Sequence, residues 1–201
     1  MKTTTHLSVA AVLTVLMQMG CQSPATDTRQ ILHLPELDQV RIEDAFWSPK
    51  LETWRKVTAN DVLGKFEGKY TPFPGWDDTR DAFRNFDRVA EGQRDIKQHD
   101  GPEWYDGLVY ESIRGIADFL AGHPNKEMEK RIDGYIDRIY AAQQTEPTGY
   151  INTHTQLMEN DHRWGDNGGL LRGQHDVYNA GMLIEAGVHY YQATGKTRLL
   201  E

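Results

Sequence analysis

The sequence predicts an all-α fold in which helical hairpins are joined by long polar and aromatic loops. Apolar residues recur at spacings of three and four over several stretches, which is the period of an amphipathic helix. Clusters of glycine and proline separate these stretches and predict loops. No segment alternates convincingly between apolar and polar residues, although residues 149–153 are compatible with a short extended piece.

The first helix is expected to begin at Ser48-Pro49. A hydroxyl suits the N-cap, and proline suits the first helical position because its φ is already helical. Residues 64–77 hold three glycines and two prolines, so we expect a loop there. A short second helix follows over residues 83–89, where apolar residues return at helical spacing.

The clearest hairpin covers residues 105–144. Its two apolar stripes are Val109, Ile113, Ile116 and Leu120, then Met128, Ile132, Tyr135, Ile136 and Ile139. The stop signal between them, residues 122–125, is short, so the two helices are expected to pack antiparallel. A second long loop is predicted over residues 146–173. A last helix is predicted from His175 to Ala193, with Gly195 as its terminator.

Composition excludes several classes of protein. The chain has 201 residues and a formal charge of -8, and 38% of its residues are hydrophobic and 26% charged, as in a soluble globular protein. The acidic balance argues against a nucleic-acid binder. The single cysteine excludes an intramolecular disulfide and a cluster of several thiolates on zinc within this chain. Five Trp and nine Tyr suit either core packing or contact with sugars.

The first residues are typical of an export signal. A short basic start and the apolar run of residues 7–19 end at Gly20-Cys21, which resembles a bacterial lipoprotein signal with Cys21 as the lipidated residue. The alternative is an ordinary cleaved secretory signal. We therefore predict a signal over residues 1–21, a tether and lead-in over residues 22–40, and a domain over residues 41–201. The predicted location is the periplasm or the cell surface, with the membrane reached only through the lipid anchor.

One face of the last helix is polar. His175, Tyr178, Met182, Glu185 and His189 recur at helical spacing and share this face. No basic residue occurs in this helix before the terminator, which favours a wet cavity over bulk solvent; a plain solvent face is the alternative. The neighbouring apolar stripe is expected to face other helices; it consists of Val177, Ala180, Ile184, Val188 and Tyr191.

The loop before this helix adds Asn152, His154 and Trp164, hydrogen-bonding side chains beside a large ring. Such groups suit hydroxyl-rich ligands, although turn capping and packing would also explain them. Several histidines are present, but the spacing H-E-x-x-H is absent, so metal ligation is disfavoured. No serine-hydrolase, phosphate-loop or dinucleotide motif occurs.

Three motifs in order resemble glycoside hydrolase family 127, the β-L-arabinofuranosidase-like proteins. They are residues 46–49 (FWSP), residues 142–153 with Gln143-Gln144 and GYINT, and residues 175–196, which begin HDVYNAGMLIEA and end ATGK. The resemblance covers about residues 40–201. Met182 stands where the family usually has His, and Asp176 replaces the usual Glu, which indicates a divergent subfamily.

The resemblance implies an (α/α)6 barrel and a retaining glycosidase acting on glycans that contain arabinofuranose or a related sugar. In the family a cysteine thiolate on zinc is the nucleophile and a Glu is the acid/base, and none of these groups is assigned to this chain. One hairpin takes 40 residues, so six exceed the length that follows the signal. We therefore expect an N-terminal part of the barrel, inactive by itself, with any zinc held by cysteines beyond residue 201.

The predicted substrate-binding residues are His175, Tyr178, His154, Trp164 and Asn152, with Glu185 in a supporting role and no catalytic or metal-binding residue. The alternative function is a non-catalytic, glycan-binding surface lipoprotein that uses the same helix face and loop. A polysaccharide lyase or sugar isomerase on a similar helical barrel is a third possibility. No nucleic-acid partner is expected.

Overall fold

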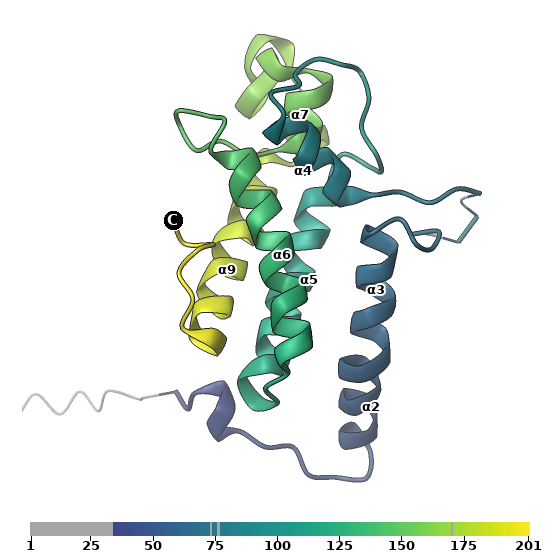
Figure 1. The fold of residues 1–201 in the computed structure, drawn as a ribbon, viewed down its shortest axis with the longest axis vertical. Coiled ribbons are helices and arrows are strands. Elements are labelled where there is room, and N and C mark those ends of the chain that lie inside the picture. Colours follow the sequence, from purple (N-terminus) through teal and green to yellow (C-terminus); the bar gives the residue numbers. More distant parts are fainter. Residues whose placement is uncertain (1–33, 73, 76, 170) are drawn as a thin grey trace, which may run out of the picture. The chain divides into compact units, whose positions relative to one another are not determined.

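The computed structural model describes residues 34–72, 74–75, 77–169 and 171–201. The predicted signal, Cys21 and most of the tether lie outside the described residues. One compact unit spans Pro35–Glu201, and its regular elements are helices (Figure 1). In the part of the chain that is described, no helix has the length and apolar character needed to cross a membrane.

The elements are η2 (Leu37–Gln39), α2 (Trp47–Thr53), η3 (Trp54–Thr58), α3 (Ala59–Phe66), α4 (Ala82–Ala90), α5 (Tyr105–Gly122), α6 (Lys126–Gln143), α7 (Thr153–Met158), η4 (Asn160–Gly168), α8 (Leu171–Gln174) and α9 (Asp176–Thr194). The first three helices after η2 form one continuous rod, because the backbone stays helical at both junctions, with η3 as a π-helical turn.

The first residue of this rod differs from the predicted one, and so does its N-terminal cap. Ser48 is the N-cap that the sequence predicts, but the helix begins one residue earlier, at Trp47. Oδ1 of Asp44 accepts from the backbone N–H of Phe46 at 2.8 Å and from that of Trp47. A carboxylate at a helix start satisfies N–H groups that have no partner within the helix and is stabilised by the helix dipole.

The core lies between α3, α4, α5 and α6. The Phe83 and Tyr135 rings are stacked with centroids 4.0 Å apart, and Phe66 packs on Tyr105 at 5.2 Å. Phe83 and Phe86 are fully buried. Burial of each such side chain contributes about 1.5–3 kcal/mol to folding. Both apolar stripes of the predicted hairpin contribute to this core, which confirms the helical period read from the sequence.

The pairing of the helices differs from simple hairpin packing. Three residues connect α5 to α6, and the two run antiparallel as predicted (Figure 1). The most extensive helix contact of α5 is nevertheless with α9, and α6 packs mainly on α4. Gly107 lies against Asn179 near the start of both helices, and Asp118 pairs with His189 near their ends. The α5 and α9 helices therefore run parallel.

Two loop predictions need correction. The rod continues through Gly64 to Phe66, because Tyr70 packs over Gly64 and a Cβ there would lie 2.5 Å from Cε2 of that ring. The predicted loop over residues 146–173 contains α7, η4 and part of α8. Asn152 caps α7 by accepting from the N–H of Thr155 at 3.1 Å, so the turn residues of this segment start a helix.

The apolar stripe of α9 also departs from expectation. Val177, Ile184, Val188 and Tyr191 are exposed, and the buried face instead contains Asn179, Ala186, Gly187 and Tyr190. The reason is geometric, since Gly107 of α5 lets Asn179 approach closely and Leu199 and Leu200 pack against Gly187, so this side of α9 is the covered one. Tyr190 then reaches α6, where its hydroxyl donates to Asp133 at 2.7 Å.

Candidate functional site

His175 lies at the junction between the long loop and α9. It is the N-cap residue and has a left-handed backbone with φ of 58°. Its Nδ1 lies 2.8 Å from the carbonyl oxygen of Gly173. A carbonyl only accepts, so in the neutral ring Nδ1 carries the proton and Nε2 presents a lone pair. The Trp104 ring lies 5.6 Å from the imidazole and the Tyr178 ring 6.4 Å from it.

Tyr178 lies one turn further along α9, as its spacing predicts, and is 44% exposed. Its hydroxyl donates to Oε1 of Glu111 on α5, and this hydrogen bond raises the pKa of the tyrosine. Trp104, His175 and Tyr178 thus form an aromatic cluster at the end of the α5–α9 pair where both helices begin. We call these three residues the loop-end cluster.

His154, on α7, contributes an unpartnered nitrogen near this cluster. Its Nδ1 is buried and has no hydrogen-bond partner among the described residues, and its ring meets that of His99 edge-on at 5.2 Å. Burial lowers the pKa of His154 and outweighs the nearby carboxylates of Glu159 and Glu103, which raise it, so the neutral ring is favoured. The neutral ring therefore keeps an unsatisfied acceptor nitrogen, which a ligand hydroxyl reaches when the side chains that cover it move aside.

A buried hydrogen-bond network lies next to His154. Asp106 accepts from both the backbone N–H and the hydroxyl of Thr153 at 2.7 Å. His99 contacts the Thr153 hydroxyl at 3.1 Å, and Asn85 approaches the same His99 nitrogen at 3.1 Å. Burial raises the pKa of Asp106 to about 6 and lowers that of His99 to about 3. These groups fix α7 on the start of α5.

Trp164 lies in η4, where the backbone is not regularly helical. The residue is 51% exposed, and its ring meets the Tyr150 ring edge-on at 5.3 Å. The guanidinium of Arg163 covers the Tyr150 ring at 4.6 Å. Exposed indole surface on a loop held this closely provides a flat apolar area of the kind that sugar rings contact.

Asn152 and Glu185, two of the predicted residues, contact other residues of the chain. Asn152 is fully buried; besides capping α7 it donates to the carbonyl of Gln174 at 2.8 Å. Glu185 pairs with Arg114 on α5, away from the loop-end cluster. Sugar contact by Asn152 and the supporting role of Glu185 stay predictions.

The polar face of α9 turns toward α5 along most of its length. Tyr178, Glu185 and His189 each contact a polar residue of α5, and His189 lies 2.6 Å from Asp118. The predicted stripe is therefore a row of interhelical polar contacts. These contacts stay partly accessible: the Glu185 and Arg114 side chains are 47% and 37% exposed, and those of His189 and Asp118 are 31% and 39% exposed.

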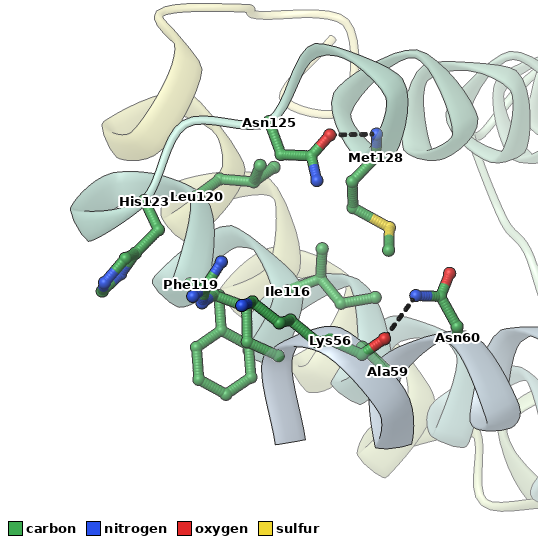
Figure 2. A pocket seen from close by; sticks show the side chains of 10 residues that line it. Lys56, Ala59, Asn60, Ile116, Phe119, Leu120, His123, Asn125 and Met128 are labelled. Carbon is green, nitrogen blue, oxygen red and sulfur yellow. Dashed lines mark hydrogen bonds between the residues drawn. The ribbon is translucent and has the colours of Figure 1, made fainter. Parts of the chain in front are cut away.

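A separate pocket of about 150 Å³ lies at the opposite end of α5 (Figure 2). Ile116, Phe119, Leu120 and Met128 supply its apolar side chains. Its polar residues are Arg55, Lys56, Asn60, His123 and Asn125. None of the predicted site residues lines this pocket. The loop-end cluster, which contains His175 and Tyr178 and lies near His154, is therefore the candidate site that the sequence predictions favour.

Sequence reasoning missed two members of the site. Trp104 immediately precedes α5, and Glu111 lies on its second turn. Trp104 follows Gly101-Pro102 at a helix start, and this position could have indicated an ordered aromatic residue. Glu111 had no such signal, because its partner Tyr178 is 67 residues away in the sequence.

The described residues do not fit a zinc centre. Among residues 34–72, 74–75, 77–169 and 171–201, no three His, Cys, Asp or Glu side chains come together as metal ligands would. The histidines nearest each other, His99 and His154, pack edge to face. This part of the chain therefore offers no set of ligands for zinc.

The fold defines a class: all-helical proteins built from hairpins, consistent with part of a helical barrel. A family model for the GH127 catalytic domain of β-L-arabinofuranosidase matches residues 39–201. The chain therefore belongs to glycoside hydrolase family 127. A curated non-reducing end β-L-arabinofuranosidase from Bifidobacterium longum subsp. longum is 35% identical over 116 residues, which are 57% of this chain and 17% of that protein.

Two solved structures are similar as well. A GH127 β-L-arabinofuranosidase from Geobacillus stearothermophilus T6 has a TM-score of 0.67 and 32% identity, and the match covers 80% of this chain and 24% of that one. A second GH127 β-arabinofuranosidase has a TM-score of 0.66 and 30% identity, covering 82% and 24%. The chain spans about a quarter of the length of these structures. The comparisons confirm the predicted family and the all-α class.

Proposed function

We propose that this chain supplies the sugar-binding part of a β-L-arabinofuranosidase-like glycoside hydrolase that acts on arabinofuranose-containing glycans. The observation that carries the proposal is the loop-end cluster, with the unpartnered Nδ1 of His154 beside it. Rings offer surface to the apolar face of a sugar, and imidazole nitrogens accept from its hydroxyls. Family membership supports the choice of sugar.

The residues take distinct roles in this proposal. His175, Tyr178, His154 and Trp164 contact the sugar. Asn152 holds α7 in place, and Glu185 orients Arg114. No residue of this chain is assigned as nucleophile or acid/base; the carboxylates of Glu111 and Asp176 accept hydrogen bonds within the fold.

The test uses His175→Ala, with His189→Ala as its matched control. Both histidines lie on the same face of α9, but they are fourteen residues apart, about 21 Å along a helix. Binding of methyl β-L-arabinofuranoside is measured by calorimetry, and the melting temperature is recorded for each variant. We expect His175→Ala to weaken binding about tenfold at unchanged melting temperature, because one hydrogen bond and its ring contact are lost.

His189→Ala should leave sugar affinity unchanged, because His189 contacts Asp118 and is remote from the cluster. If His175→Ala lowers the melting temperature and leaves affinity unchanged, the cluster is structural and the proposal is wrong. Binding without hydrolysis by the chain is the expected result. Hydrolysis of an arabinofuranoside by the chain alone would contradict the absence of assigned catalytic residues. If a longer protein that contains this chain also binds without hydrolysis, the glycan-binding lipoprotein is favoured.

The proposal includes export with a lipid anchor at Cys21. Its support is the sequence pattern alone, an apolar run that ends at the single cysteine. Stable anchoring needs more than one acyl chain, as in a mature lipoprotein. Palmitate labelling of the wild type and of Cys21→Ala in a bacterial host tests this part. Equal labelling of both, or a mature N-terminus elsewhere, would overturn it.

A further inference from the structure

Asp176, on the first turn of α9, is a buried carboxylate that joins three segments of the chain. The residue is 2% exposed. Its Oδ1 accepts from the hydroxyl of Tyr150 at 2.8 Å and from the side-chain amide of Asn152 at 2.5 Å. Its Oδ2 accepts from the backbone N–H of Trp164 at 2.8 Å. The hydroxyl of Thr155 adds a longer contact to Oδ1 at 3.4 Å.

The chemistry of this arrangement requires a carboxylate. An ionised carboxylate only accepts and has about four lone-pair positions, and all of its partners here are donors. A carboxamide of the same size keeps one acceptor oxygen and turns N–H groups toward a donor. Asp176→Asn therefore breaks the contact with either Trp164 or the Tyr150–Asn152 pair.

The contact with Trp164 holds an unfavourable backbone conformation. Trp164 has φ of 57°, in the left-handed region that a bulky side chain rarely adopts, and Gly165 follows with φ of 84°. On the other side of Trp164, Arg163 binds Glu146 at 2.7 and 2.9 Å. The sharp turn is thus held by two anchors, and the one nearest the indole is Asp176.

Asp176 also positions the indole ring of Trp164, through its hydrogen bond with Tyr150. The ring of Trp164 meets the Tyr150 ring edge-on, and the hydroxyl of Tyr150 ends on Asp176. Backbone and ring of Trp164 are therefore positioned by the same carboxylate. The indole is 51% exposed, so a large part of its surface is free to meet a ligand.

We infer that Asp176 is a positioning residue that fixes Trp164 as one wall of the sugar site and so determines the affinity of that site for an arabinofuranosyl group. This inference rests on the proposed function, which supplies the ligand. Asp176 does not touch the ligand, because it is buried beneath the loop that it holds. Its effect reaches the sugar through the position of the indole.

The first experiment compares Asp176→Asn with Asp166→Asn in the full chain. Asp166 is an exposed carboxylate in the same loop, so the control removes the same charge without touching Trp164. Hydrogen exchange is followed in two peptides, residues 160–169 and residues 109–117 of α5. We expect Asp176→Asn to speed exchange in the loop peptide about tenfold, and to leave the α5 peptide unchanged. Asp166→Asn should match the wild type in both.

The second experiment is a double-mutant cycle with Trp164→Ala, read by calorimetric affinity for methyl β-L-arabinofuranoside. If Asp176 acts through Trp164, the double variant binds as weakly as Trp164→Ala alone, and the two losses do not add. Should Asp176→Asn fail to fold, Tyr150→Phe removes one donor to the same carboxylate; it is expected to speed loop exchange by a smaller factor, about threefold, with the same non-additive binding.

Unchanged loop exchange, faster exchange throughout α5, or additive losses of affinity would each overturn the inference, because each separates Asp176 from the position of Trp164. A wild type that binds no arabinofuranoside is a different result. In that case local loop exchange still supports positioning of Trp164 by Asp176, and the proposed function is what fails.

Discussion

Gly107 on α5 lies directly against Asn179 on α9. A Cβ at Gly107 would lie 2.5 Å from Oδ1 of Asn179 and 3.0 Å from Cε1 of Tyr178. Asn179 is fully buried, and its side-chain nitrogen and oxygen have no hydrogen-bond partner in the part of the chain that the structure describes. The α5 and α9 helices therefore approach closely beside the loop-end cluster, and the missing side chain of Gly107 permits it.

Gly107→Ala is expected to lower the free energy of unfolding by about 1–3 kcal/mol, because the added methyl group displaces Asn179 and Tyr178. Gly115→Ala on the same helix is the control, since a Cβ there meets no atom within 4 Å. That variant should gain up to about 1 kcal/mol from helix propensity. Urea unfolding of both variants measures the difference; two variants with equal stability would contradict the close approach.

Glu146 is expected to stabilise the fold through two arginines. Burial opposes its ionisation, but hydrogen bonds from Arg163 and Arg94 outweigh this and hold the pKa at about 2. Because the pKa in the folded state is lowered, the stabilisation is present above the unfolded value of 4.5 and is lost as pH falls toward 2.

Glu146→Gln should therefore lower the free energy of unfolding by about 2–4 kcal/mol at pH 7. The difference from the wild type should shrink as pH falls from about 4.5 toward 2. Urea unfolding at several pH values measures this difference. Glu91→Gln, at an exposed carboxylate after α4, is the control and should change little. A pH-independent loss in Glu146→Gln would show that the ion pairs do not cause it.

The contribution of Asp106 to the free energy of unfolding is expected to depend on pH in the opposite direction. Burial raises its pKa to about 6, so between about pH 4 and pH 6 the folded chain binds a proton that the unfolded chain has released. The contribution of Asp106 to stability therefore falls as pH rises through this range. Relative to the wild type, Asp106→Asn should become more favourable by about 2–3 kcal/mol between pH 4 and pH 7. Parallel stability profiles of the two proteins would rule this out.

His99 is expected to stay neutral in the folded protein. Burial, with the nearby His154, lowers its pKa to about 3, and its Nδ1 donates to the carbonyl of Gly101 at 3.1 Å. The unfolded chain takes up a proton near pH 6.5 and the folded chain does not, so this group lowers stability as pH falls below 6.5. Nitrogen chemical shifts of His99 should show a protonated Nδ1 and no titration above about pH 4. A midpoint near the ordinary histidine value would contradict the buried environment.

The sequence by itself determined the helices of the hairpin and the last helix, although it predicted loop where α7 and η4 form. The apolar period of α5 and α6 and the glycine at the end of α9 predict those helices, because these signals act between residues three or four positions apart. The three family motifs likewise predicted the family. His175 and Tyr178, one turn apart, were placed on one face by the same local geometry.

Only the tertiary structure decided which helices pair and what the polar residues contact. The contact of α5 with α9 joins residues about seventy positions apart, and helical period contains no information about such a partner. For the same reason Glu111 was missed as the partner of Tyr178, and the apolar stripe of α9 was assigned to the wrong face. The sequence marked Asp176 only as a departure from the family pattern; burial against residues 150–155 and Trp164 makes its carboxylate the acceptor that holds Trp164.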